Sequence, residues 1–260
     1  MNRSPLRWTL VVDPPAPGWR NMAVDCALLD LVMREEGGVA FLRLYQWEPH
    51  CLSFGRHEPV GRRYDRERIR ELGLDCVRRP TGGRAVWHAR ELTYAVAAPL
   101  VGFGGLKAAY RAIHEMLAGA LRRLGLNAQL APASVSPGPS AGPCFAAPVG
   151  GEVLVEGHKV VGSAQVRQGS AFLQHGSMLL EDDQALVRGL AGSSHSSAEA
   201  PVARLLQRQV TFAEAADAVA AAAGSFPGEW LLRQDLPGAV EERAGFHASR
   251  FRSPAWTWDR

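Results

Sequence analysis

Apolar residues recur along this chain at two spacings, and each spacing predicts one type of element. One set lies on a single helical face, at steps of four, three and four residues: Met22, Cys26, Leu29 and Met33. We expect a helix over 21–36, with Asn21 as its N-cap and Gly37-Gly38 as its end. A stronger apolar stripe predicts a second helix over 110–124, ended by Gly125.

Short apolar or alternating runs bounded by proline and glycine predict strands over 6–12, 41–47, 51–54, 91–99 and 170–180. We expect 51–54 to continue the sheet that 41–47 begins. Residues 152–167 are predicted as two strands joined near Gly157, which with 170–180 would form an antiparallel meander. Residues 61–71 mix charges of both signs and predict one solvated helix.

The C-terminal part, about 184–260, is predicted to be helical. Thr211 and Glu214 have the spacing of a capping box, and they open an alanine-rich run that ends at Ala223. Strands therefore come in antiparallel runs with helices interspersed, without strict βαβ alternation. This order predicts the α+β class, with mostly antiparallel mixed sheets flanked by helices.

Charge and composition narrow the function classes. The formal net charge of +3 is too small to argue for a nucleic-acid partner. No apolar run approaches the ~20 residues of a membrane span, and no signal peptide is recognised, so we expect a cytoplasmic protein. The four cysteines, Cys26, Cys51, Cys76 and Cys144, form no CxxC pair and have no histidine at zinc-finger spacing. We therefore expect reduced thiols and no metal site.

Candidate chemistry is concentrated in residues 142–180. Cys144 lies in the Pro- and Gly-rich segment 131–150, and Lys159 follows in the predicted hairpin. A thiol and an amine close in sequence can serve as a nucleophile and its activator. Lys159 stands out because lysine is scarce in an arginine-rich chain. The structural alternatives are a loop thiol without a role and a lysine on a hairpin surface.

A second informative stretch runs from Arg78 to His88. Its adjacent glycines, Gly82 and Gly83, allow a tight turn with free backbone N–H groups. The arginines around that turn could bind a carboxylate or phosphate. The alternative is a hairpin turn with exposed arginines.

Several segments together resemble the biotin/lipoate protein ligase catalytic-domain family, on its lipoate side. They occur in the family's order: 21–25, Trp47-x-Pro49, 53–56, 78–88, 157–164 and 173–177. The resemblance implies a mostly antiparallel sheet flanked by helices, in a single catalytic domain over 1–260 on which the part from about 184 packs. It also implies that the Gly-Gly loop and the lysine strand line an acyl-binding slot, with Lys159 near the acyl carbonyl.

Finer details resemble the octanoyltransferase of the type found in Gram-positive bacteria: 143–145, 79–86 and 91–94. The resemblance implies transfer of octanoyl from acyl carrier protein to a lysine of a lipoyl-domain protein through a cysteine thioester. An ATP-dependent lipoate ligase and an octanoyl amidotransferase acting between lipoyl-domain proteins remain alternatives. One departure from the family pattern is Ala89-Arg90, where an acidic residue is expected after His88.

The implied catalytic residues are Cys144 and Lys159. The implied substrate-binding residues lie on the two glycine-containing stretches: Arg79, Thr81, Gly82, Gly83, Arg84, Ala85, Val86, His88, Gly162, Ser163, Ala164, His175 and Gly176. Lys159 could lower the thiol pKa by its charge or act as a base, and His175 could assist proton transfer or brace the loop. Free amides of the Gly82-Gly83 turn could form an oxyanion site.

The expected partners are octanoyl-acyl carrier protein and lipoyl-domain proteins, namely the glycine cleavage H protein and E2 subunits. We expect no cofactor, with ATP needed only under the ligase alternative. We also expect no nucleic acid, no membrane and a monomer.

Overall fold

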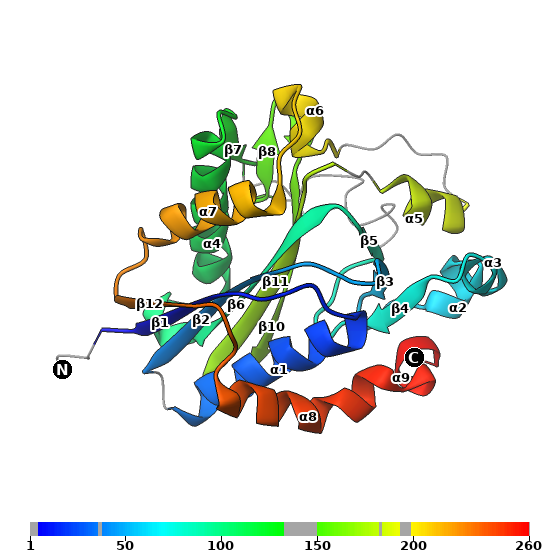
Figure 1. Ribbon diagram of the computed structural model, residues 1–260, viewed down its shortest axis with the longest axis horizontal. Coiled ribbons are helices and arrows are strands. Elements are labelled where there is room, and N and C mark those ends of the chain that lie inside the picture. The colour runs from blue at the N-terminus through cyan, green and yellow to red at the C-terminus, as the bar shows by residue number, and fades with distance from the viewer. Residues whose placement is uncertain (1–4, 36–37, 133–149, 182–183, 193–198, 260) are drawn as a thin grey trace.

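A computed structural model of the protein describes residues 5–35, 38–132, 150–181, 184–192 and 199–259 (Figure 1). Strand β2 (Val39–Tyr45) shows how sequence alternation builds its core. Leu42 and Leu44 pack on one side of the sheet, whereas Phe41 and Tyr45 pack on the other. Because successive side chains of a strand point to opposite faces, both faces of this sheet are buried.

Within the described residues, six strands form the central sheet in the order β10-β11-β6-β2-β1-β12. Their bounds are Val161–Gln168 for β10, Ala171–Leu179 for β11, Glu91–Pro99 for β6, Arg7–Val12 for β1 and Glu229–Arg233 for β12. Strands β10, β11, β6 and β2 pair antiparallel, whereas β1 is parallel to both β2 and β12. Strand β12 corrects the prediction of an all-helical C-terminal part, because it extends the sheet beside β1.

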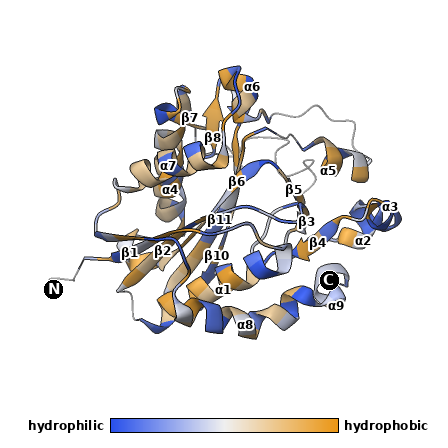
Figure 2. Cartoon of the chain, in the orientation of Figure 1, coloured by the Kyte–Doolittle hydropathy of each residue, from blue (hydrophilic) through white to orange (hydrophobic). Residues whose placement is uncertain are grey.

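Two pairs of helices cover the two faces of this sheet (Figure 1). Helices α1 (Gly18–Arg34) and α8 (Gly238–Arg252) pack side by side on one face. Helices α4 (Leu106–Arg123) and α7 (Phe212–Ala223) cover the other. The Thr211 hydroxyl accepts the Glu214 backbone N–H, which confirms the predicted cap of α7. Figure 2 shows that α8 mixes hydrophilic and hydrophobic residues, as expected of a helix with one face in solvent.

Two three-stranded sheets flank the central one. The first has the order β4-β3-β5, with β4 at Asp75–Arg78, β3 at Cys51–Phe54 and β5 at Val86–His88. The prediction that 51–54 continues the sheet of β2 is therefore wrong. The second has the order β7-β8-β9, with β7 at Ala128–Leu130, β8 at Val153–Val155 and β9 at His158–Lys159.

Shorter elements connect these layers. They are α2 (Val60–Arg63), α3 (Arg66–Glu71), the 3₁₀ turn Leu100–Gly102, α5 (Ala185–Leu190), α6 (Val202–Leu206) and α9 (Pro254–Trp258). The single helix predicted over 61–71 is two short ones, because Tyr64 is extended and Asp65 caps a new helix by accepting the Arg68 N–H. The two strands predicted over 152–167 are three, because β9 and β10 belong to different sheets.

The start of α1 also differs from its prediction. The helix begins at Gly18, so Asn21 lies inside it and is fully buried. Its side-chain amide donates to the backbone carbonyls of Ala16 and Gln46, which satisfies a polar group that could not be buried alone. Taken together, mixed sheets flanked by helices confirm the α+β class. Among the described helices, none is long and apolar enough to cross a membrane.

Candidate active site

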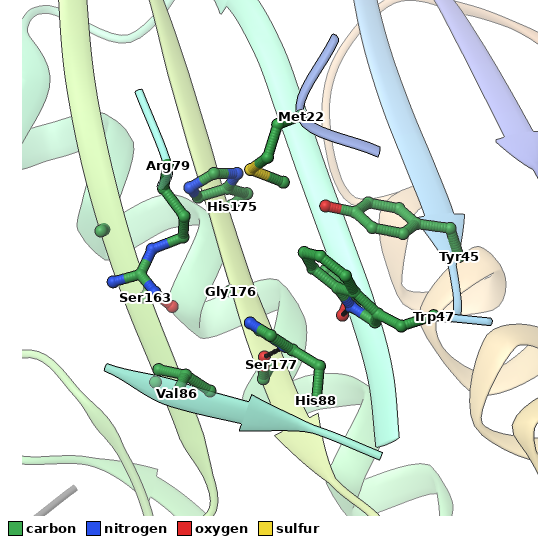
Figure 3. A pocket seen from close by; sticks show the side chains of 13 residues that line it. Met22, Tyr45, Trp47, Arg79, Val86, His88, Ser163, His175, Gly176 and Ser177 are labelled. Carbon is green, nitrogen blue, oxygen red and sulfur yellow. Dashed lines mark hydrogen bonds between the residues drawn. The ribbon is translucent and has the colours of Figure 1, made fainter. Parts of the chain in front are cut away.

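A cavity opens between the central sheet, strand β5 and the start of α1 (Figure 3). The space among its lining atoms measures about 340 Å³, a value that includes open solvent at the mouth. Its lining residues come from segments far apart in the sequence: Met22, Tyr45, Trp47, Arg79, Val86, His88, Thr93, Gly162, Ser163, Ala164, His175, Gly176 and Ser177. Met22, Tyr45 and Trp47 are almost fully buried, whereas Ser163, Ala164 and Gly176 are half-exposed. The cavity therefore has an apolar inner end and a mouth on β10 and β11.

The cavity brings together many of the residues expected to bind substrate. Those that line it are Arg79, Val86, His88, Gly162, Ser163, Ala164, His175 and Gly176. Those that lie outside its lining are Thr81, Gly82, Gly83, Arg84 and Ala85. Ala85 packs instead in a separate apolar cluster with Phe54 and Tyr64. The Gly82-Gly83 loop lies beside the cavity mouth, since a Cβ on Gly83 would lie 3.9 Å from that of Ala164.

Five lining residues are absent from the expected set: Met22, Tyr45, Trp47, Thr93 and Ser177. All except Tyr45 lie within the sequence segments that carry the family resemblance, so that signal was present. Tyr45 could have been found only from its place on β2.

Arg79 holds the Gly-Gly loop from inside the protein. It is 5% exposed, and its guanidinium donates to the carbonyls of Ser53 (2.9 Å), Gly82 (3.3 Å) and Arg84 (2.8 Å). Arg78 is also buried, and it donates to the Thr257 and Gly55 carbonyls. The alternative of a hairpin with exposed arginines is therefore wrong for these two residues.

His175 is held by contacts on both ring nitrogens. Its Nδ1 donates to Asp25 Oδ2 at 2.8 Å, and its Nε2 lies 2.6 Å from the Thr81 hydroxyl on the Gly-Gly loop. Asp25 is fully buried, and Arg43 and the Tyr45 hydroxyl also donate to it. An aspartate on Nδ1 leaves Nε2 as the acceptor for the Thr81 O–H. In this structure Nε2 is occupied by the Thr81 hydroxyl, so His175 braces the Gly-Gly loop.

His88 forms a second buried histidine–carboxylate pair beside the same cavity. Its Nδ1 donates to Glu91 Oε1 at 2.7 Å, and its Nε2 lies 2.5 Å from the Ser53 hydroxyl. The ring stacks on Trp47 at 4.0 Å. Burial lowers the pKa of His88, so the neutral ring is favoured. The position after His88, where the family pattern has an acidic residue, is Ala89, and the carboxylate that pairs with His88 belongs to Glu91.

Comparison with known proteins identifies the family of this chain. The sequence pattern of the lipoyl protein ligase A/B catalytic domain matches residues 17–224, which is most of the chain. The chain belongs to this family. The match includes all of the residues that line the cavity.

Curated relatives agree with this assignment. The octanoyltransferase LipM of Kyrpidia tusciae is 42% identical over 189 residues, which cover 69% of this chain and 68% of the relative. That of Staphylococcus aureus is 36% identical over 185 residues, covering 68% of this chain and 67% of the relative.

Among solved structures, protein Ta0514 of T. acidophilum superposes with a TM-score of 0.78 at 19% identity, covering 98% of this chain and 99% of its own. Lipoate-protein ligase A bound with ATP gives 0.77 at 18%, covering 96% and 98%. These two structures confirm the lipoate-ligase fold.

Of the two residues expected to be catalytic, Lys159 is among the described residues and Cys144 is not. Lys159 is 2% exposed and forms an ion pair with Glu152, with 2.6 Å between Nζ and Oε1. It lies outside the cavity lining, three residues before Gly162. Cys144 falls outside the described residues. The described residues contain no cluster of histidine, cysteine or acidic side chains suited to a metal ion.

The three described cysteines are poor candidates for a nucleophile. Burial raises the pKa of Cys26 and Cys76 to about 12, and it raises that of Cys51 well above its usual value. A thiol with a raised pKa stays protonated, and the thiolate is the nucleophilic form.

Proposed function

We propose that this protein moves an octanoyl group from octanoyl-acyl carrier protein to a lysine of a lipoyl-domain protein, in lipoate biosynthesis. The observation that carries the proposal is the identity of 36–42% with relatives named octanoyltransferase LipM, each over about two thirds of its length. The acceptors would be the glycine cleavage H protein or E2 subunits. The route would be a thioester on Cys144.

The proposed reaction has two steps. The Cys144 thiol gives up its proton and attacks the carrier's thioester carbonyl, so that a new C–S bond forms, the carrier's C–S bond breaks and the departing carrier sulfur takes up the proton. The lysine amine then attacks the octanoyl-Cys144 carbonyl, so that a C–N bond forms, the C–S bond breaks and a proton passes from nitrogen to sulfur. Thioester exchange is nearly thermoneutral and amide formation is downhill. The sequence of steps therefore requires no ATP.

The cavity suits the acyl chain of such a substrate. Its buried end consists of apolar or aromatic side chains, with Met22 and Tyr45 fully buried and Trp47 at 2% exposure. Each buried methylene contributes about 0.8 kcal/mol to binding. The polar groups nearest this end already have partners, since Tyr45 donates to Asp25 and Trp47 donates to Thr93. An alkyl chain can therefore enter without breaking these hydrogen bonds.

We propose that Lys159 acts through its charge. Its partner Glu152 is buried at 4% exposure, and a carboxylate at 2.6 Å pairs with an ammonium group. An ammonium group stabilises the negative charge of a thiolate or of an acyl oxygen, but it cannot accept a proton. The ion pair thus supports the first of the two roles considered for Lys159, and the base role would require that pair to break.

Intact mass after mixing the protein with octanoyl-acyl carrier protein, without ATP, tests the proposal. We expect one octanoyl adduct that is lost in Cys144→Ala and kept in the matched control Cys76→Ala. An adduct that survives Cys144→Ala would overturn the thioester route. Activity only with ATP and free lipoate would establish the ligase alternative, and acylation only by an octanoylated lipoyl domain would establish the amidotransferase.

We further propose that the protein acts as a cytoplasmic monomer. The surface best suited to a dimer contact is strand β12 at the edge of the central sheet, where the side chains of Leu231 and Leu232 are 55% and 67% exposed. Light scattering across a range of protein concentrations should give the mass of one chain. A rise to twice that mass, reversed by Leu232→Lys, would contradict the monomer and identify β12 as the interface.

A further inference from the structure

Ser163 is a polar residue of the cavity mouth whose hydroxyl has two partners. The Tyr94 hydroxyl lies 2.6 Å from Ser163 Oγ, and Nε2 of His114 lies 2.8 Å away. Ser163 itself is half-exposed and lines the cavity, whereas Tyr94 and His114 are fully buried behind it. Across the described part of the chain, the Ser163 side chain has no third partner. The question is which way the hydrogens point.

One end of the network is fixed by a backbone carbonyl. Nδ1 of His114 lies 2.6 Å from the carbonyl oxygen of Gly151. A carbonyl oxygen can only accept, so Nδ1 carries the hydrogen. In the neutral ring Nε2 is then a lone-pair acceptor, and the Ser163 O–H must donate to it. Burial favours this neutral ring.

The other end is fixed in the same way. The side-chain amide of Gln165 donates to the Leu106 carbonyl at 3.3 Å and to Oε1 of Gln174 at 2.7 Å. The amide nitrogen of Gln174 therefore faces Tyr94 and donates to its oxygen at 2.8 Å. The Tyr94 O–H is left to donate to Ser163. Every hydrogen in the chain from Gln165 to Gly151 thus points the same way, and successive bonds polarise one another.

This direction decides what Ser163 can offer to a ligand. A hydroxyl has one hydrogen and two lone pairs. The hydrogen goes to His114 and one lone pair receives the Tyr94 hydrogen, so a single acceptor site remains. We propose that Ser163 is a subsite for an N–H donor, namely the ε-amine of the acceptor's lysine, and that His114 is the positioning residue that keeps Ser163 an acceptor. This inference rests on the proposed octanoyl transfer.

The subsite acts on the second step of that transfer. A hydrogen bond from one N–H of the incoming amine to Ser163 Oγ would fix the nitrogen while its lone pair remains free to attack the acyl carbonyl. Ser163 takes no proton, since the amine's proton passes to the leaving sulfur. The acyl oxygen is excluded from this position, because two acceptors cannot share a hydrogen bond. Ser163 therefore distinguishes the nucleophile from the acyl group.

Two substitutions at His114 separate this role from a structural one. In His114→Gln the side-chain oxygen can take the place of Nε2 and accept the Ser163 O–H. In His114→Asn the amide can still donate to Gly151, but no acceptor reaches Ser163, whose hydroxyl is free to turn into the cavity. Each variant therefore keeps a different one of the two hydrogen bonds that His114 makes. Both variants reduce the bulk of the side chain to a similar extent.

The test is a single-turnover measurement in two stages. Each protein is first loaded with octanoyl-acyl carrier protein and weighed, and a lipoyl domain is then added to follow loss of the octanoyl adduct. We expect loading to stay within about threefold of wild type in both variants, which also reports that they are folded. Transfer to the lipoyl domain should be slowed about tenfold in His114→Asn and in Ser163→Ala, but less than threefold in His114→Gln.

Other results would overturn the subsite. Equal transfer rates in His114→Asn and His114→Gln would do so, as would transfer and loading that fall by the same factor. A wild-type protein that takes up no octanoyl group would overturn the proposed function and the subsite with it. Normal loading with unaltered transfer in every variant would overturn the subsite alone.

Discussion

Asp25 on helix α1 and His175 on strand β11 are 150 residues apart in the sequence and 2.8 Å apart in the structure. Asp25 also accepts from Arg43 and Tyr45, so one buried carboxylate joins α1, β2 and β11 at the inner wall of the cavity. Because His175 holds Thr81 with its other nitrogen, the same contact reaches the Gly-Gly loop. The stability of the fold and the shape of the cavity are therefore linked through Asp25.

Asp25→Asn should lower the free energy of unfolding substantially. The substitution removes a charge from a buried ion pair, in which both side chains are 0% exposed. Breaking such a pair costs about 3 kcal/mol or more, although Asp13 still partners Arg43 here. Urea denaturation should show this loss. Glu241→Ala breaks the half-exposed pair with Arg20 and should cost less than about 1 kcal/mol. Equal losses in the two variants would show that Asp25 contributes no more to stability than a half-exposed ion pair.

Stability should fall as the pH drops below neutrality, in part through His114. Burial lowers the pKa of His114 to about 4, with the charge of Lys159 acting in the same direction and the bond to Gly151 opposing it. In the unfolded chain the pKa is about 6.5, so between the two values the unfolded state binds a proton that the folded state does not. The contribution is about 3 kcal/mol, lost from pH ~6.5 down to ~4 and constant below.

Urea denaturation across that pH range checks this expectation. His114→Gln should flatten the curve relative to wild type. Replacing the exposed His57 by Gln should leave its shape unchanged. A curve of His114→Gln that runs parallel to wild type would show that His114 is not the titrating group.

Gly176→Ala should separate strands β10 and β11 at the cavity mouth. A Cβ at this position would lie 2.3 Å from the Gly162 carbonyl oxygen and 2.7 Å from Ser163 Oγ. No side-chain adjustment relieves a clash with backbone, so we expect a loss of about 1–3 kcal/mol and a reduced rate of octanoyl transfer. Gly189→Ala on α5, where a Cβ meets nothing within 4 Å, should be neutral or slightly stabilising. Thermal melting of both variants would show whether the two behave differently.

Met22→Ala should change the preferred acyl length. Met22 is fully buried at the inner end of the cavity, and its truncation opens space for a longer chain. A decanoyl chain has two more methylenes to bury than an octanoyl chain. Their burial should raise the ratio of kcat/KM for decanoyl over octanoyl donors on the order of tenfold. Met33→Ala lies on the same helix outside the cavity lining and should leave that ratio unchanged. A shift of similar size in both variants would argue for a general loosening of α1.

Local signals predicted many elements well. Strand β6 has the predicted bounds, and α4 covers the predicted apolar stripe and ends before Gly125, which has a φ of +99°. Strand β12 was not predicted, because among the described strands it pairs with β1 alone, more than two hundred residues earlier. Strand β3 was predicted, but in the wrong sheet. Propensity is a property of the segment, whereas the choice of a neighbouring strand depends on the whole chain.

The sequence by itself determined the α+β class, the ordered segments of the lipoate-ligase family and most of the residues that line the cavity. Only the tertiary structure decided what those residues contact there: Arg79 turns inward to hold the Gly-Gly loop, Glu91 pairs with His88, and Ser163 meets the buried His114. The physical reason is that the state of a buried polar group depends on its hydrogen-bond partners. Here those partners come from distant parts of the chain, and packing alone brings them together.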